Sequence, residues 1–387
     1  MSYGALSGFT IAITADRRSE EQAELITRRG GAVLSGAVIR TLPLSDEPAL
    51  RSATSLLIAR PPDVAVLCTS LGVRGWFSAA AGLGLDAGLS DALRSARVIA
   101  RGPKAAGAAL AVGVAVDWMT PGATYSEVID HLASLPTRHQ DGTPVRVAVQ
   151  LDGQDSSGMG ESLQALGYDV VAVRVYRWTM PTDVGPAERI ASAVGDGLVD
   201  AVTFTSAHAV ANFVAIARQA GTWDRVLERV NRDVTVCCVG PVTAATARSA
   251  GVHDPLEPTL PRLGAMVQVL ARAFAERSVT LHLNDVAVHV QGRLVVIGEG
   301  EPVRLADRER AVFDALAHQP GAVLSKRALA ERVWAGAVDD HVVEVTIGRL
   351  RKRLGPAGAS IGTVMRRGYR LDLTGGVGTR ASIVAGP

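Results

Sequence analysis

The sequence predicts an α/β chain: a large domain of two lobes with parallel sheets, followed by a smaller α+β domain. Three observations predict this fold class. Strand and helix patterns alternate from about residue 10 to 275, which is typical of parallel sheets covered by helices. The strands are continuous apolar runs such as VAVLC and VTVCCV, as expected when both faces of a sheet are buried. After about residue 277 apolar residues recur with period two between glycine turns, which indicates short antiparallel strands.

The large domain contains an internal repeat. The run AVLCTS at 65–70 returns as AVTFTS at 201–206, an offset of 136 residues, and the Gly-Pro pairs that begin at Gly102 and Gly240 are 138 apart. The opening TIAITADRR matches VRVAVQLDG about 137 residues later. Three matched pairs at one nearly constant offset indicate two copies of one strand–helix unit. We therefore expect two similar lobes that face each other across a cleft.

The polar signatures of both copies lie where strands end. Ligands of parallel sheets bind beyond the carboxyl ends of the strands, so the Thr-Ser and Gly-Pro turns are candidate ligand contacts. A local interpretation stays open, because Thr or Ser before a helix is also an ordinary N-cap. One residue can serve both purposes.

Composition limits the possible classes of protein. The 387 residues correspond to two or three domains, and a net charge of +2 means that any surface for nucleic acid must be local. Only three of the 40 basic residues are lysines, which indicates a GC-rich bacterial genome. The cysteines, Cys68, Cys237 and Cys238, lack CxxC spacing, so we expect small hydrophobes and neither a disulfide framework nor a metal site. The N-terminus lacks signal-peptide features and no apolar run is long enough to span a membrane, so a cytoplasmic protein is expected.

The smaller domain concentrates positive charge. Residues 301–375 carry 13 Arg or Lys against 9 Asp or Glu, and helices are predicted over 307–318, 326–333 and about 340–354. In the third helix an apolar stripe of Val343, Ile347, Leu350 and Leu354 leaves the arginines on the other surfaces. A solvated charged face is one interpretation, and a helix that enters the major groove of DNA is the other.

The strings LADRERAVFDALAHQPGAVLSKRALAERVW, VVEVTIGRLRKRLG and TVMRRGYRL resemble the winged-helix output domain of OmpR/PhoB-type response regulators. The resemblance covers about 277–374, followed by a tail at 375–387. It implies an α+β winged helix-turn-helix domain that binds double-stranded DNA, commonly as a homodimer, with 340–354 as the recognition helix. It places Thr346 and Arg349 toward the bases, Arg351 toward phosphate and Thr363 at the start of the wing. The expected DNA-binding residues are completed by Lys352, Arg353, Arg366 and Arg367.

A phosphoacceptor receiver domain normally precedes such a winged helix, but the sequence argues against one. A single acid, Asp16, follows the first strand, and Lys104 is the only lysine before Lys326. The repeat instead resembles uroporphyrinogen-III synthase through TIAITADRR, VRVYRW, FTSAHAV and VGPVTAATARSAG, over about 8–275. This resemblance implies a domain at 1–275 with one lobe formed by 1–41 and 179–275 and the other by 42–178.

The synthase family converts hydroxymethylbilane, a linear tetrapyrrole with eight carboxylates, to uroporphyrinogen III without a metal or cofactor. The resemblance implies that Tyr176 is the proton donor, since a tyrosine with a pKa of ~10 stays protonated at neutral pH. An ordinary core tyrosine is the alternative. Ser206 and Thr243 are the other expected catalytic residues, as partners of substrate carboxylates. The further ligand-binding residues are expected to be Arg17, Thr69, Ser70, Gly102, Thr205 and Gly240.

Together the two resemblances predict a transcriptional regulator whose N-terminal domain senses a tetrapyrrole-pathway ligand, either hydroxymethylbilane or uroporphyrinogen III. Uroporphyrinogen III leads to sirohaem, the cofactor of nitrite and sulfite reductases, so control of nitrite or sulfite assimilation is a natural target. The alternative is an active synthase that also carries a DNA-binding domain. A third hypothesis is a lobed domain that serves only in dimerisation or partner binding.

Overall fold

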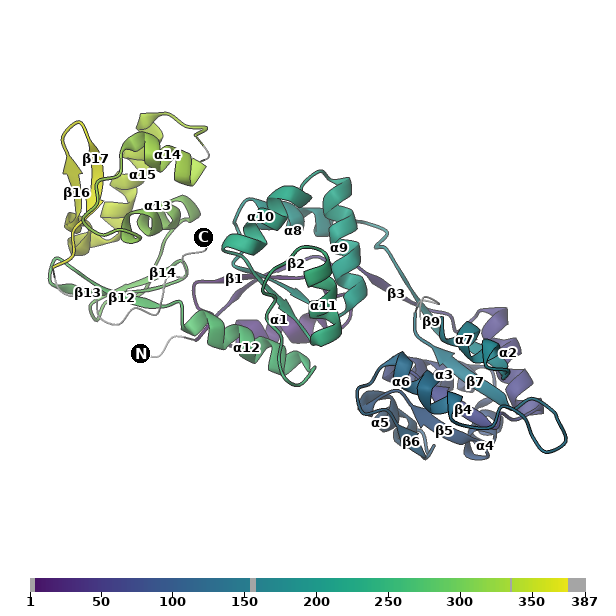
Figure 1. The fold of residues 1–387 in the computed structure, drawn as a ribbon. Helices are drawn as coiled ribbons and strands as arrows, with labels where there is room; N and C mark the ends of the chain where they lie inside the picture. The colour runs from purple at the N-terminus through teal and green to yellow at the C-terminus, as the bar shows by residue number, and fades with distance from the viewer. Residues whose placement is uncertain (1–3, 154–157, 335, 375–387) are drawn as a thin grey trace. The chain divides into compact units, whose positions relative to one another are not determined.

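The computed structural model describes residues 4–153, 158–334 and 336–374, so the predicted tail at 375–387 lies outside the described residues. The chain divides into two compact units (Figure 1). One, called lobe two here, is Arg40–Met180. The other runs to Ile39 and resumes at Pro181, and it contains both lobe one and the C-terminal domain. The predicted fold class is confirmed: two parallel-sheet lobes are followed by an α+β winged helix.

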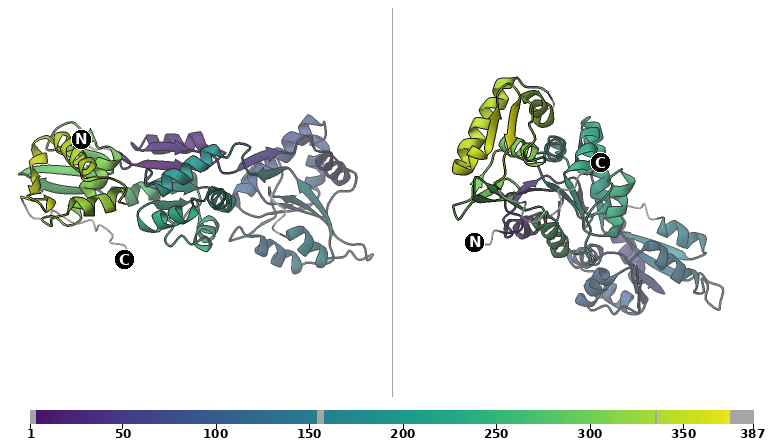
Figure 2. Two further views of the ribbon diagram at one scale, coloured as in Figure 1. Left: turned by 90° about the horizontal axis from the view of Figure 1, so that it is seen from above. Right: turned by 60° about the vertical axis from the view of Figure 1, so that its left-hand side comes forward.

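Lobe one is a four-stranded parallel sheet in the order β11-β10-β1-β2. Figure 1 and Figure 2 show helices on both of its faces. On one face Ile11 and Ile13 pack against Met266 and Phe274 of α12, and on the other Phe204 meets Phe213 at 5.4 Å between ring centroids. The elements are β1 (Thr10–Ile13), α1 (Ser19–Thr27), β2 (Ala32–Ser35), α8 (Gly185–Gly195), β10 (Ala201–Phe204), α9 (Ala207–Gln219), α10 (Trp223–Arg232), β11 (Thr235–Cys238), α11 (Pro241–Ser249) and α12 (Leu263–Ala275).

Lobe two is a five-stranded parallel sheet in the order β6-β5-β4-β7-β8. Alternate residues of a strand enter different cores: Ala65 and Leu67 face one core, while Val64 and Val66 face the other. Both faces are therefore buried, which explains the uninterrupted apolar run. The elements are α2 (Pro48–Ala59), β4 (Val64–Leu67), α3 (Ser70–Gly82), α4 (Asp86–Arg94), β5 (Arg97–Ala100), α5 (Pro103–Ala111), β6 (Trp118–Met119), α6 (Tyr125–Ala133), β7 (Arg146–Leu151), α7 (Met159–Ala165) and β8 (Asp169–Arg174).

A short antiparallel ribbon marks where the chain enters and leaves lobe two. It pairs β3 (Arg40–Pro43) with β9 (Tyr176–Thr179), and Tyr176 lies opposite Pro43. Tyr176 is thus fixed at the first position of a paired strand, and its side chain belongs to the core of lobe two.

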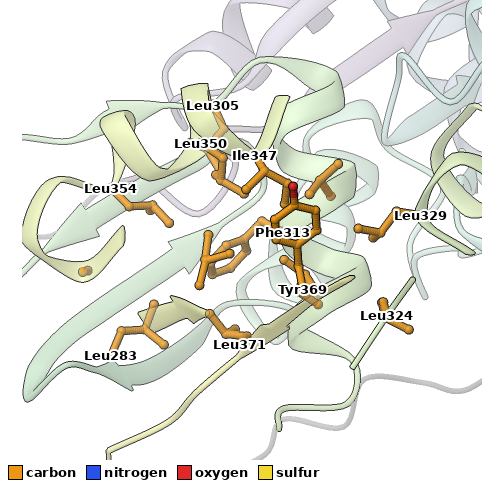
Figure 3. Close-up of a cluster of buried hydrophobic side chains, with 14 of the residues drawn as sticks. Leu283, Leu305, Phe313, Leu324, Leu329, Ile347, Leu350, Leu354, Tyr369 and Leu371 are labelled. Atoms are coloured by element: carbon orange, nitrogen blue, oxygen red, sulfur yellow. The ribbon is translucent and has the colours of Figure 1, made fainter. Parts of the chain in front are cut away.

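Three residues separate the end of α12 from the first strand of the C-terminal domain. Its antiparallel sheet β12-β13-β14-β15, its hairpin β16–β17 and its three α-helices pack around one apolar core (Figure 3). Phe313, Ile347, Leu350 and Tyr369 lie together in this core, as the apolar stripe of the third helix predicts. The elements are β12 (Val279–Leu283), β13 (Val286–Gln291), β14 (Leu294–Ile297), β15 (Val303–Arg304), α13 (Asp307–Ala317), α14 (Lys326–Trp334), α15 (Asp340–Arg353), a 3-10 helix (Gly355–Ser360), β16 (Ile361–Val364) and β17 (Gly368–Leu371).

The three cysteines are buried and free. Burial raises the pKa of Cys68 and of Cys238 to about 12, so their thiols are neutral at physiological pH. Among the described residues, no group of three or more His, Cys, Asp or Glu side chains is placed to hold a metal ion. Within the same part of the chain, no helix has the length and apolar character to cross a membrane.

One buried hydrogen bond in lobe two allows a test of the packing. Trp76 Nε1 donates to Thr54 Oγ1 at 2.9 Å, and both side chains are at most 1% exposed. Thr54→Val keeps the shape of the side chain but removes this acceptor of the indole N–H, so we expect a loss of about 1–3 kcal/mol in the free energy of unfolding. Urea denaturation measures this loss. Thr54→Ser keeps the acceptor, and a serine variant that is less stable than the valine variant would contradict the prediction.

Candidate functional site

Residues that follow strands β4, β5 and β7 meet at one edge of the lobe-two sheet, because neighbouring parallel strands end on the same side. Thr69 follows β4 and is the N-cap of α3, where its hydroxyl accepts from the Gly72 N–H at 2.9 Å. The Thr69 N–H donates to Oε1 of the fully buried Gln150 at 3.1 Å. Thr69 therefore performs the capping role that the sequence left open. Ser70 begins α3, and Gly102 caps α5.

Tyr176 is directed at this same edge. Its hydroxyl lies 3.2 Å from Thr69 Oγ1, and its ring meets the edge of Trp178 at 5.6 Å between centroids. A Cβ on Gly153 would come within 2.7 Å of both rings, so only glycine lets the chain after β7 lie against them. Burial raises the pKa of Tyr176, so the hydroxyl is a neutral group held in place, with 4% of the residue exposed.

A charged cluster that sequence reasoning missed lies beside Tyr176. Arg101 Nη1 is 3.8 Å from Asp152 Oδ2, and the Arg101 guanidinium lies 4.4 Å from the centre of the Tyr125 ring. The Tyr125 hydroxyl donates to Asp152. Burial and the Asp152 carboxylate raise the pKa of Tyr125, which keeps this donor protonated. The available signal was position, since Arg101 and Asp152 each come directly after a strand.

Lobe one repeats the arrangement at the carboxyl ends of β1, β10 and β11. Ser206 is the N-cap of α9 and accepts from the Ala209 N–H at 3.1 Å, next to the partly exposed Thr205. Gly240 caps α11 and Arg17 is exposed after β1. Thr243 lies inside the first turn of α11 and is 4% exposed, as little as Tyr176.

In the C-terminal domain, α15 presents Arg349 and Lys352 to solvent and buries the predicted apolar stripe. The Asp339 side chain caps the helix by accepting from the Val342 N–H at 3.1 Å. Thr346, which the sequence places toward the DNA bases, is 8% exposed in the structure, and its hydroxyl donates to the Val342 carbonyl at 2.8 Å.

Two other basic side chains of α15 are engaged within the domain. Arg351 was expected to contact phosphate, but its Nε donates to the Ile361 carbonyl at 3.0 Å and its Nη2 to Thr363 Oγ1 at 2.8 Å. It therefore ties the helix to the hairpin. Arg353 pairs with the buried Glu309 of α13 at 2.9 Å.

The hairpin β16–β17 forms the rest of the exposed basic surface. Arg366 and Arg367 are exposed at its turn, where Arg366 has a φ of 57°, and Met365 is 81% exposed. A groove of about 460 Å³ separates this turn from the start of α14 and is lined in part by Lys326, Thr363, Arg366 and Arg367. Exposed cations on the helix and on the hairpin are thus the groups available to an anionic partner.

Comparison with known proteins gives two family matches. Residues 20–268 match the family described as Uroporphyrinogen-III synthase HemD, and residues 300–371 match Transcriptional regulatory protein, C terminal. Uncharacterized protein YjjA of Bacillus subtilis (strain 168) is 26% identical over 275 residues, which cover 70% of this chain and 98% of YjjA.

Two further similarities concern the separate parts. A mutant uroporphyrinogen-III synthase from Thermus thermophilus is 29% identical, with a TM-score of 0.55, 68% of this chain covered and 98% of that structure. Transcriptional regulatory protein PrrA of Mycobacterium bovis is 30% identical over an alignment of 144 positions that covers 34% of this chain and 61% of PrrA.

The contacts of Arg351 predict a stabilising role. In Arg351→Met the partly buried Ile361 carbonyl loses its guanidinium donor, so the free energy of unfolding should fall by about 1–3 kcal/mol. Lys352→Met is the matched control, since Lys352 is exposed on the same turn of the helix. Thermal melting of the two variants gives the comparison, and equal melting temperatures would show that Arg351 does not hold the hairpin.

Proposed function

Because this chain belongs to the uroporphyrinogen-III synthase HemD family through residues 20–268 and carries a transcriptional-regulator C-terminal domain at 300–371, we propose that it is a regulator that binds duplex DNA and senses a carboxylated tetrapyrrole. The genes it controls would then be those that need products of uroporphyrinogen III, including the sirohaem enzymes of nitrite and sulfite assimilation.

The observation that carries the DNA-binding half is the exposed basic face of α15. Arg349 and Lys352 are exposed on a helix whose other side packs in the core. Their backbone positions are therefore fixed before any contact with DNA. Arginine can bond guanine O6 and N7 in the major groove, and lysine suits phosphate. Arg366, Arg367 and Thr363 on the hairpin would contact the neighbouring backbone, with two copies of the chain on one operator.

The ligand-binding half is supported by the edge of lobe two. Arg101 offers a cation, and the N-termini of α3 and α5 offer backbone N–H groups that favour anions. A tetrapyrrole with several carboxylates matches this chemistry. Arg101 is 24% exposed at its side chain, so its guanidinium can reach a ligand while Tyr125 and Asp152 hold its orientation.

Active synthesis of uroporphyrinogen III is the second candidate function, and Tyr176 favours it. The neutral hydroxyl at 3.2 Å from Thr69 is a potential general acid for loss of the terminal hydroxyl of hydroxymethylbilane. Incubation of the purified chain with enzymatically generated hydroxymethylbilane decides the matter. Type III isomer above the spontaneous type I background, abolished in Tyr176→Phe, establishes an enzyme. Its absence together with tight tetrapyrrole binding removes the synthase candidate and leaves a ligand-binding domain, as the sensing proposal requires.

For DNA, Arg349→Ala should lower discrimination between a selected operator and a scrambled duplex by about 1–3 kcal/mol, since a bidentate base contact is lost. Lys352→Ala should weaken binding to both duplexes equally and reduce the slope of log affinity against log salt by about one for each bound copy. Operators are first selected from random duplexes, and affinities are then measured by fluorescence anisotropy. If Arg349→Ala loses the same affinity for both duplexes, that residue contacts phosphate instead.

For the ligand, Arg101→Met should weaken binding of uroporphyrin III roughly tenfold or more, because a charge-assisted hydrogen bond is worth about 1.5–3 kcal/mol. Arg97→Met is the control: Arg97 begins β5 at the opposite edge of the sheet, whereas Arg101 follows its end. Quenching of protein fluorescence during titration gives both affinities. The same loss in both variants would indicate a general charge effect and remove Arg101 from the site.

A further inference from the structure

The passage from lobe one to the winged helix is short and anchored. Only Glu276, Arg277 and Ser278 separate α12 from β12. The Arg277 side chain returns to lobe one, where its Nη2 donates to Thr235 Oγ1 of β11 at 2.6 Å and its guanidinium lies 4.5 Å from the centre of the Phe274 ring. The connection therefore has little freedom of its own.

A second contact joins lobe one to the winged helix through backbone carbonyls of lobe one. The turn between β13 and β14 lies against residues 4–9, which precede β1. Gln291 Nε2 donates to the carbonyls of Gly4 and Ser7 at 2.9 and 3.2 Å, and the Arg293 N–H donates to the Gly8 carbonyl at 2.8 Å. A Cβ on Gly8 would lie 2.2 Å from the backbone carbonyl oxygen of Gln291. A Cβ on Gly292 would lie 2.6 Å from the backbone carbonyl oxygen of Gly8. The two backbones touch without space for a side chain.

Arg293 completes the contact with charge. Its side chain is only 8% exposed and bonds acceptors from both domains. On lobe one, Nη1 lies 2.6 Å from Asp200 Oδ2 and Nη2 donates to the Leu198 carbonyl at 3.1 Å. On the winged helix, Nε lies 2.5 Å from Asp307 Oδ1 at the start of α13. Asp200 Oδ2 also accepts from the Thr10 N–H at 2.7 Å, so one carboxylate holds Arg293 and the start of β1 together.

The position of this contact relates it to the residues of lobe one that the sequence predicts as ligand contacts. Thr10 and Asp200 lie at the amino ends of β1 and β10, while Arg17, Thr205 and Ser206 follow the carboxyl ends of the same two strands. On the other side, α13 begins at Asp307 and shares its core with α15 through Phe313 and Ile347. Two buried strands and one helix therefore connect the ligand edge of lobe one to the DNA-facing helix.

We propose that Arg293 locks the winged helix onto lobe one as a single rigid body, and that this lock is the route by which a ligand in the lobed domain changes DNA affinity. The lock itself is independent of the proposed function, and its use in regulation rests on that function. Without Arg293, the carboxylates of Asp200 and Asp307 lose their shared cation, and the winged helix gains rotational freedom.

The lock is tested first without ligand, in the full chain. Met365→Cys places a single exposed thiol on the hairpin for a fluorescent label, since the three native cysteines are buried. We expect the labelled parent to show the slow anisotropy decay of a large body. Arg293→Met should add a fast component from independent motion of the domain. Asp307→Asn removes the negative charge of this half-exposed partner but keeps its acceptor oxygen, so it should add the fast component to a smaller extent.

Arg304→Met is the control, because Arg304 is exposed on β15 of the same domain, and it should behave like the parent. An unchanged decay in both Arg293→Met and Asp307→Asn overturns the lock.

The regulatory arm measures affinity for a selected duplex with and without uroporphyrin III. We expect the ligand to change the affinity of the parent, and we expect this change to be lost in Arg293→Met while uroporphyrin III and the duplex each still bind. A ligand effect that persists in Arg293→Met overturns the proposed route. If uroporphyrin III leaves the DNA affinity of the parent unchanged, the sensing function fails, and the anisotropy result still decides the lock.

Discussion

A parallel strand that is buried on both faces can present polar groups to a partner only at its two ends, and the positions of the polar contacts in this chain follow from that constraint. Most side chains along β1, β4 and β10 fill apolar cores, and the buried Thr203 of β10 bonds the Ala12 carbonyl and Gln22. The polar groups that a partner can reach therefore lie at the strand ends. The carboxyl ends hold Thr69, Arg101 and Ser206. The amino ends of β1 and β10 hold Thr10 and Asp200, where the winged helix attaches through Arg293. The two ends of β10 thus carry different groups: Asp200 contacts the winged helix, and Ser206 caps α9.

Patterns that are local in sequence predicted the fold. Continuous apolar runs predict buried parallel strands, and the repeat at an offset near 137 predicts two lobes because each copy repeats the same strand–helix order. The apolar stripe at 3–4 spacing predicts both the helix α15 and the side that it buries. The exposed positions of Arg349 and Lys352 follow from the same spacing, since they lie off the stripe. The three helices of the C-terminal domain begin and end within one residue of their predicted ranges.

Contacts between distant residues could not be predicted in this way. Thr346 sits at the border of the stripe, and only the packing of the domain decides that it is buried. Arg351 resembles its exposed neighbours in sequence, yet it finds acceptors on the hairpin ten and twelve residues away. Arg101, Tyr125 and Asp152 come from three separate segments that only the sheet order brings together. Arg293 is 93 residues from Asp200, and no periodicity relates them.

A rigid junction gives a ligand a means of action that a flexible linker lacks. Domains on a flexible linker influence each other mainly through effective concentration, so ligand binding in one leaves the orientation of the other unchanged. Packed cores are close to incompressible, and strands of four residues span only about 13 Å. A shift imposed at the carboxyl ends of β1 and β10 therefore reaches Thr10 and Asp200 with little loss. In the proposed mechanism, a ligand acts only if its affinity differs between two states. Those two states would be two orientations of α15, and the buried Arg293 contact would make that orientation depend on lobe one.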